Sequence, residues 1–189
     1  MEKVKLGKRN LVYPLPVVLV GTNTNGKPNY LTVSFCSVVS KNPAMLAISL
    51  SKEQYSRIGI HESGQFSVNI PSSDMVELID YCGLVSGRDT DKSLKFKNFY
   101  GLLNVPMIED CPVNIECKLV KNIELEGSNE IFIGEIIETY SHNDYITNNT
   151  PDITKIKPLV ISMYDFFYWS IGEKIGKAWS LGKNLINKS

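Results

Sequence analysis

The sequence predicts a mainly β protein, built as an antiparallel barrel with inserted helices. Two observations carry this prediction. Several short apolar stretches have strand patterns and are separated by turn signals, and these strands do not alternate regularly with helices. We expect residues 1–189 to form one domain, because this length suits a single domain with or without an appendage.

The first expected elements are two strands within residues 16–40. The dipeptide Asn25-Gly26, followed by Pro28, is typical of a turn between paired strands. Residues 44–51 form a further short apolar run. Alternation along the second strand separates its side chains into two faces, with Leu31, Val33, Phe35 and Ser37 on one and Thr32, Ser34, Cys36, Val38 and Ser40 on the other.

Two helices are expected in the next part of the chain. Residues 53–64 predict a helix that stops at Gly64, and the strand-like residues 65–71 follow it. A second helix begins after an N-cap at Ser73 or Asp74. Its apolar side chains keep the helical spacing, at Met75, Leu78, Ile79 and Cys82. A polar connector then runs to about Pro106.

Strands return in the last third of the chain. One has Val113, Ile115, Cys117 and Leu119 on one face and Asn114, Glu116 and Lys118 on the other. Residues 130–140 form the next strand, in which Gly134 indicates a bulge or a close backbone approach. Residues 141–158 are too polar for a core and predict a loop. A final strand and an aromatic segment around residues 164–169 follow. We expect most of these aromatic side chains to lie in a core or an interface, and one of them is a candidate to stack on a ligand ring.

Composition excludes several classes of function. The chain has 20 basic and 20 acidic residues, so no global field attracts nucleic acid or anionic lipid. No stretch reaches the roughly 20 apolar residues of a membrane span. The basic N-terminus is not followed by an apolar run of signal length, and we expect a cytoplasmic protein. Its four cysteines and two histidines show no common metal-site spacing, and no Rossmann or P-loop motif is present.

Two polar clusters are candidates for a binding site. Hydroxyls and cations gather at a predicted strand-to-helix junction, at Ser49, Ser51, Lys52, Ser56 and Arg57. Such groups at a helix N-terminus commonly bind phosphate, although a capped helix with solvated charges would have the same composition. The stretch CGLVSGRDTDK, residues 82–92, carries more polar groups than a turn needs and indicates either a ligand or a solvated turn.

Several motifs, in this order along the chain, resemble those of one family. They are PLPVVLVGTNTNGKPNYLTVSFCSVVSKNPAMLAISL (14–50), SGQFSVNIP (63–71), YCGLVSGRDTDK (81–92), CPVNIECKLV (111–120), GSNEIFIGEI (127–136) and YWSIGEKIG (168–176). From about Pro14 to Leu181, the chain resembles the FMN-binding split-barrel family, in its flavoredoxin and flavin reductase-like branch. The resemblance implies a six-stranded antiparallel split β-barrel with short helices and a C-terminal extension, which forms a homodimer.

The resemblance also implies non-covalently bound FMN near the subunit interface. The expected cofactor-binding residues are Asn29, Thr32, Ser34, Phe35, Cys36, Ser37, Ser49, Ser51, Lys52, Ser56, Ser86, Lys92, Asn129 and Tyr164. Among them, Lys52 and Ser56 are expected to hold the phosphate, and Lys92 is expected to lie by the flavin ring, held by the turn at residues 86–89. Relatives often carry Trp at the position of Phe35, His at that of Asn129 and Thr at that of Ser56.

The function implied is that of an FMN-dependent oxidoreductase or electron carrier. Electrons would pass from NAD(P)H or a protein donor to flavin or another acceptor, and neither nucleic acid nor a membrane is an expected partner. The ring chemistry belongs to the flavin, so no side chain is assigned as nucleophile or general base. The alternative is a non-catalytic module that binds FMN for storage or sensing.

Overall fold

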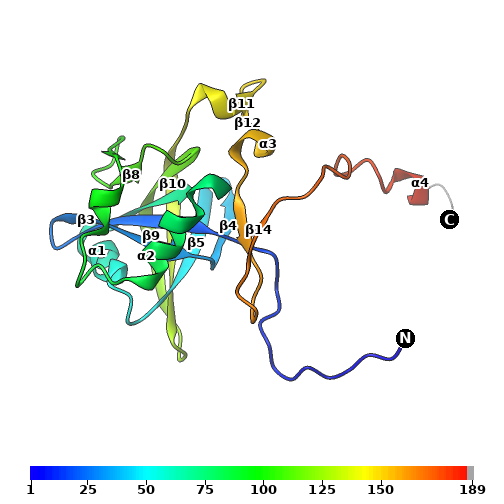
Figure 1. The fold of residues 1–189 in the computed structure, drawn as a ribbon, viewed down its shortest axis with the longest axis horizontal. Helices are drawn as coiled ribbons and strands as arrows, with labels where there is room; N and C mark the ends of the chain where they lie inside the picture. The colour runs from blue at the N-terminus through cyan, green and yellow to red at the C-terminus, as the bar shows by residue number, and fades with distance from the viewer. Residues whose placement is uncertain (187–189) are drawn as a thin grey trace.

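The structure, a computed structural model, describes residues 1–186 and consists of a β-rich body from which both terminal segments extend (Figure 1). Within these residues, the main sheet has seven antiparallel strands in the order β3-β2-β6-β9-β10-β5-β4. The strands are β2 (Val18–Thr24), β3 (Lys27–Val33), β4 (Cys36–Lys41), β5 (Ala44–Ser51), β6 (Gln65–Ile70), β9 (Val113–Glu124) and β10 (Asn129–Ser141).

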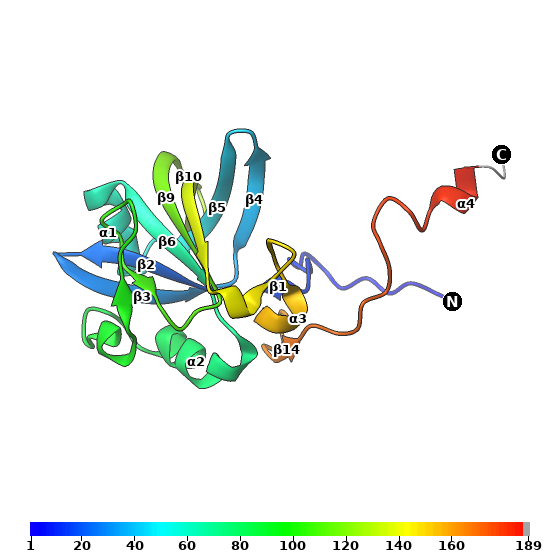
Figure 2. The ribbon, with the colours of Figure 1, turned by 90° about the horizontal axis from the view of Figure 1, so that it is seen from above.

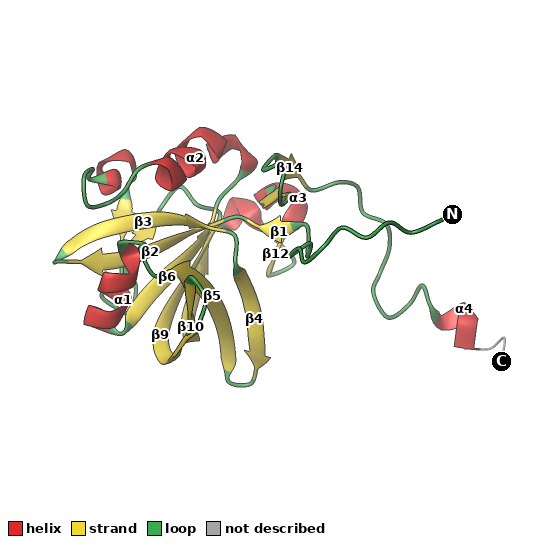
Figure 3. Ribbon diagram, turned by 90° about the horizontal axis from the view of Figure 1, so that it is seen from below, coloured by secondary structure: helices red, strands yellow, loops and turns green. Residues whose placement is uncertain are grey.

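The sheet closes on itself at one end only. β3 and β4 lie at opposite edges of the sheet, yet only Ser34 and Phe35 separate them in the chain. The edges therefore have to meet there. The β4–β5 pairing continues into this segment, since the amide of Ser49 on β5 donates to the carbonyl of Phe35 over 2.9 Å. Away from this point, the β2–β3 and β4–β5 hairpins diverge (Figure 3). The result is a split barrel, which confirms the predicted fold class.

The sequence predicts a single strand from the Asn25-Gly26 turn to residue 40, and this prediction is wrong in one respect. It divides at Ser34-Phe35 into β3 and β4, because the chain crosses there from one edge of the sheet to the other. Counted as one interrupted strand, the pair brings the barrel to the six strands that the resemblance implies. The turn itself is confirmed, since Asn25 and Gly26 adopt φ of 52° and 74°.

The barrel interior is apolar and tightly packed. Its largest buried side chains include Phe66 and Phe132. A Cβ atom at Gly134 would lie 2.6 Å from Cζ of Phe66, and the β9–β10 register shifts at Gly134. Both expectations for this glycine are therefore confirmed, because only a residue without a side chain leaves room for the phenyl ring.

Two helices pack outside the barrel. α1 (Ser56–Ser63) ends at Gly64 in the left-handed conformation, as predicted. The short 3₁₀ turn η1 (Ser73–Met75) leads into α2 (Val76–Leu84), which lies beside β3 (Figure 2). The N-cap of this unit is Ser72, one residue earlier than predicted, because its side chain accepts the amide of Asp74. Cys82 is buried on α2, as expected.

The connector after α2 covers the polar face of β9. It contains η2 (Lys92–Lys95), β7 (Asn98–Phe99) and β8 (Met107–Ile108). Buried Glu116 accepts the amides of Leu102 and Leu103, at 3.0 and 2.8 Å. Asn114 donates to the carbonyl of Ile108 over 2.8 Å. The predicted faces of β9 are thus present. On the polar face, Asn114 and Glu116 are buried because they bind the connector backbone, whereas Lys118 is exposed.

The last part of the chain forms a small second layer and an extended arm. The predicted loop 141–158 contains short elements instead, and they pack on buried Ile156. These are η3 (Asn143–Tyr145), β11 (Ile146–Thr147), β12 (Thr150–Pro151) and α3 (Ile153–Ile156). A three-stranded sheet follows, in the order β1 (Leu15–Pro16), β13 (Leu159–Ile161) and β14 (Tyr168–Ser170). The arm ends in α4 (Lys183–Ile186). No helix in the described part of the chain has the length and apolar character needed to cross a bilayer.

Candidate ligand groove

A groove follows the split between β3 and β5. Its closed end is a cavity of about 170 Å³ beside Ser34 and Phe35, and a second cavity of about 370 Å³ adjoins it. The two are continuous, because Ser51 and Gln54 line both. A third cavity, of about 270 Å³, shares Asn29, Tyr55 and Gly87 with the second. We refer to them as the closed, middle and outer cavities, where the closed cavity is the one at the end of the split where the barrel closes. Together they suit a long, narrow ligand.

The closed cavity combines amides and hydroxyls with apolar surface. The amide nitrogen of Asn129 donates to the hydroxyl of Ser49 over 3.1 Å, and the hydroxyl of Ser128 donates to the oxygen of Asn129 over 2.7 Å. The side-chain oxygen of Gln54 accepts the amide of Ser51 over 2.9 Å. Phe35, 38% exposed, adds an aromatic surface. Such a combination fits a planar ring with polar edges.

Thr32 also lines the closed cavity, and it ties the groove to α2. Its hydroxyl donates to the carbonyl of Ile79 in the middle of that helix. The donor of this hydroxyl is therefore in use, and only its lone pairs face a ligand. Thr32 thus fixes the wall of the groove, in addition to the direct ligand contact that the sequence predicts.

Asn29 carries the clearest sign of a missing partner in the middle cavity. Its side chain is buried and its amide nitrogen donates to the hydroxyl of Ser56 over 2.7 Å. Its oxygen Oδ1 is buried and has no hydrogen-bond partner among the described residues. Buried polar atoms are nearly always paired in folded proteins, so this oxygen fits a hydroxyl or N–H donor supplied by a ligand.

The glycine beside Asn29 is required by close packing. A Cβ atom at Gly87 would lie 2.1 Å from Oδ1 of Asn29 and 2.9 Å from Cδ1 of Tyr55. The loop after α2 therefore lies directly against the floor of the middle cavity, and a larger residue would displace it. This close approach explains one of the glycines in the polar stretch 82–92.

Lys92 is held by the C-terminal end of α2. Its side chain is 2% exposed, and its ammonium donates to the carbonyls of Cys82 and Val85 at 3.0 and 3.1 Å. These carbonyls lie at the end of α2, where helical partners are lacking. Burial lowers the pKa of Lys92 from its ordinary value. The side chain lines the middle cavity, and its described bonds go to the helix end rather than to the turn at residues 86–89.

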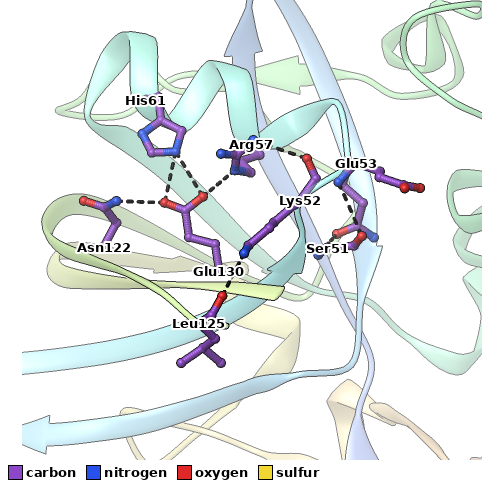
Figure 4. A network of polar contacts seen from close by, with 9 residues as sticks. Ser51, Lys52, Glu53, Arg57, His61, Asn122, Leu125 and Glu130 are labelled. Atoms are coloured by element: carbon purple, nitrogen blue, oxygen red, sulfur yellow. Dashed lines mark hydrogen bonds and ion pairs between the residues drawn. The ribbon is translucent and has the colours of Figure 1, made fainter. Parts of the chain in front are cut away.

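Two cations lie at the junction of β5 and α1, Lys52 in the loop and Arg57 in the first turn of the helix (Figure 4). Arg57 is paired with the buried carboxylate of Glu130. The ammonium of Lys52 donates to the carbonyl of Leu125 over 2.7 Å. An ammonium has three N–H groups, so this one bond leaves donors for an anion.

Ten of the fourteen predicted site residues line the closed or middle cavity. They are Asn29, Thr32, Ser34, Phe35, Ser49, Ser51, Ser56, Ser86, Lys92 and Asn129. Four lie outside these linings: Cys36, Ser37, Lys52 and Tyr164. Cys36 packs against the barrel core, and burial raises the pKa of its thiol to about 11. Tyr164 lies on the hairpin between β13 and β14, and its hydroxyl donates to the side-chain oxygen of Asn10 over 2.8 Å.

Tyr55 and Gln54 line the groove and were missed by the sequence prediction. Tyr55 lines the middle and outer cavities, and its hydroxyl accepts the amide nitrogen of Asn25 over 2.8 Å. The guanidinium of Arg88 lies 5.9 Å from the centre of its ring. Both missed residues lie in the same short loop as Lys52 and Ser56, and that proximity is the signal that could have identified them.

Comparisons with known proteins agree with this geometry. The family described as "Flavin reductase like domain" matches residues 9–166. The crystal structure of flavoredoxin from Methanosarcina acetivorans is 45% identical, covers 98% of this chain and 100% of its own, and has a TM-score of 0.95. Flavoredoxin of Desulfovibrio vulgaris (Miyazaki F) is 34% identical, with 96% and 100% covered and a TM-score of 0.90.

A more distant relative carries a named activity. The NADPH-flavin oxidoreductase of Streptomyces viridifaciens is 24% identical over 139 residues, which cover 71% of this chain and 72% of that protein. The match over residues 9–166 includes the whole barrel and every residue of the closed and middle cavities. The chain therefore belongs to the flavin reductase-like domain family.

Proposed function

We propose that this chain binds FMN non-covalently in the groove and works as a flavin-dependent oxidoreductase or electron carrier. The observation that carries the proposal is the unpaired Oδ1 of Asn29, buried midway along the groove. It lies between a cavity that fits a planar ring and a loop that carries hydroxyls and a cation. In FMN, the ribityl chain lies between the ring and the phosphate, and its hydroxyls can donate to this oxygen.

The closed and middle cavities suit the two ends of FMN. In the closed cavity, Asn129 and Ser49 would face the polar edge of the ring, and Phe35 would exclude water from it. In the middle cavity, Ser56 begins α1 next to Asn29 and would bind the phosphate together with Lys52. When bound, FMN supplies a ring that accepts a hydride or single electrons, and the chain orients and shields it.

The donor and the acceptor are proposed from the relatives. Identity of 45% with a flavoredoxin supports a carrier that exchanges electrons with proteins. The distant NADPH-flavin oxidoreductase supports direct reduction by NADPH or NADH. A non-catalytic module that stores or senses FMN is the second candidate.

The proposed assembly is a homodimer. Large apolar side chains are exposed on both terminal arms, on the β13–β14 hairpin and on the outer strand β4, a pattern typical of a surface that another protein covers. They include Val12, Tyr13, Val38, Val39, Phe166, Phe167, Trp169 and Trp179. Figures 1 and 2 show both arms leaving the barrel on the same side, where a second copy would give them a surface to pack on.

Anaerobic reduction of the FMN-loaded chain tests the function. We expect the absorbance of the oxidised flavin to bleach on addition of NADH, NADPH or a reduced protein donor, and to return when an acceptor is added. Bleaching by the nicotinamides identifies a reductase, and bleaching only by the protein donor identifies a carrier. Binding of FMN without reduction by any of these donors would favour the storage or sensor module.

A further inference from the structure

Outside the groove, one buried carboxylate gathers three side-chain donors. Glu130, near the start of β10, has no exposed surface. Its oxygens accept hydrogen bonds from Nε of Arg57 and, over 2.8 Å, from the amide nitrogen of Asn122. Nε2 of His61 lies 3.1 and 3.2 Å from the two oxygens (Figure 4). A buried charge is costly in free energy unless it is paired in this way, so we treat the carboxylate and its three donors as one structural unit.

This unit reaches the loop that carries the proposed phosphate contacts. Arg57 uses its second nitrogen, Nη1, to donate to the carbonyl of Lys52 over 3.2 Å. The amide of Lys52 donates to the carbonyl of Ser128 over 2.9 Å, and its ammonium donates to that of Leu125. Lys52 is thus held on one side by Arg57 and on the other by the turn between β9 and β10.

We propose that Glu130 is a positioning residue for phosphate binding and that it acts through Arg57. The inference rests on the proposed binding of FMN in the groove. By holding the guanidinium at Nε, Glu130 directs Nη1 to the carbonyl of Lys52 and fixes the loop at residues 51–56. That loop presents Ser51, Gln54 and Ser56 to the groove. Neither Glu130 nor Arg57 lines the groove itself.

Two other roles for the pair make different predictions. If it only fastens α1 to the barrel, its loss lowers stability and weakens all flavins equally. If Glu130 instead neutralises a cation that would otherwise attract the phosphate, its loss frees Arg57 and strengthens FMN binding. A positioning role weakens FMN selectively, because only the phosphate contacts depend on the loop.

The test compares the affinities of FMN and riboflavin, measured by flavin fluorescence titration, in Glu130→Gln and Arg57→Lys. Both variants keep roughly the size of the side chain. Glu130→Gln removes the charge that holds the guanidinium, and Arg57→Lys lacks the second nitrogen that bonds the carbonyl of Lys52. We expect the Kd of FMN to rise about tenfold and that of riboflavin to change less than twofold. The double variant should be no worse than Glu130→Gln alone, because the two residues act as one unit.

Glu116→Gln is the matched control, since Glu116 is equally buried but binds the connector on another part of the barrel. It should lower stability and keep the FMN-to-riboflavin ratio. Equal weakening of both flavins, an unchanged ratio or tighter FMN binding in the Glu130 and Arg57 variants would overturn the inference. If Glu130→Gln does not fold, Arg57→Lys decides by the same comparison. Failure of the parent chain to prefer FMN over riboflavin would instead refute the proposed phosphate site.

Discussion

At the scale of single residues, the site depends on a few close contacts around Asn29. Its nitrogen is paired with Ser56, its oxygen is unpaired, and Gly87 lies directly against that oxygen. The contact leaves no space for a side chain at position 87, so the loop after α2 and the floor of the groove are coupled. Even a small substitution at position 87 should therefore lower the affinity for the ligand.

Gly87→Ala is expected to weaken FMN about tenfold or more, since moving the loop by even a small distance disturbs several contacts worth about 1 kcal/mol each. Gly172→Ala is the control, because a Cβ atom at Gly172 meets no atom within 4 Å and the residue lines none of the three cavities. Fluorescence titration of both variants measures the effect. Equal affinity in the two would show that the middle cavity does not hold the ligand.

Lys92 illustrates what the sequence could and could not reveal. The density of polar groups in residues 82–92 indicated either a ligand or a solvated turn, and the structure places Ser86 and Lys92 in the lining of the middle cavity. The pattern could not show which atoms the ammonium binds, since the carbonyls of Cys82 and Val85 become its partners only once α2 ends at Leu84. A long side chain can fold back on its own helix as easily as reach a ligand.

Lys92→Met should therefore lower the free energy of unfolding of the ligand-free protein, by about 1–3 kcal/mol, because two buried carbonyls lose their donor. Urea unfolding measures this value. Lys95→Met, an exposed lysine on the same η2 turn, should change it little. Unchanged stability in Lys92→Met, combined with loss of FMN binding, would return Lys92 to the role of a direct ligand contact.

At the scale of elements, the hairpin β9–β10 is tied to α1 by side chains rather than by the sheet. Strand alternation only assigns Glu130 to one face of β10. Its partners come from two other elements, Arg57 from α1 and Asn122 from β9. Periodicity places a residue on a face, but it carries no information about which distant side chain meets it. For the same reason, the sequence grouped Arg57 with the polar residues at the start of α1 but could not show that it pairs with Glu130.

The stability of the protein should depend on pH through Glu130. Burial alone would raise its pKa, but the hydrogen bonds from Arg57, Asn122 and His61 hold that pKa below the ordinary 4.5. The folded state then binds fewer protons than the unfolded chain, so this stabilisation is complete above the ordinary pKa and is lost as pH falls through the lowered value. Urea unfolding from pH 7 downwards should show the loss, and Glu130→Gln should flatten the curve. An equally steep acid loss in the variant would assign it to other carboxylates.

At the scale of the whole molecule, the closure of the barrel creates the groove. β3 and β4 are neighbours in the chain and opposite edges of the sheet, so the segment Ser34-Phe35 has to bridge them. Individual strands and the Asn25-Gly26 turn could be read from alternation and turn chemistry. The division between β3 and β4 could not be predicted from the sequence, because both strands keep a strand-like pattern. The break arises because the sheet curls until its two edges meet at Ser34-Phe35.

The terminal arms make a prediction about assembly. Sedimentation at micromolar concentration should give a species of about twice the 21.2 kDa chain, since the exposed aromatic side chains on the arms need a partner surface. Replacing Phe166 and Trp169 together by serine should shift the equilibrium towards the monomer. A parent chain that sediments only as a monomer would refute the proposed dimer.

The central claim is that FMN lies along the split of the barrel with its ring at the closed end. A crystal structure of the FMN-saturated protein tests it most directly. The account predicts the ring beside Phe35 and Asn129, a ribityl hydroxyl within hydrogen-bond distance of Oδ1 of Asn29, and the phosphate at the loop of residues 51–56. Flavin density elsewhere on the molecule, or a ring at the outer cavity with Oδ1 of Asn29 still unpaired, would contradict it.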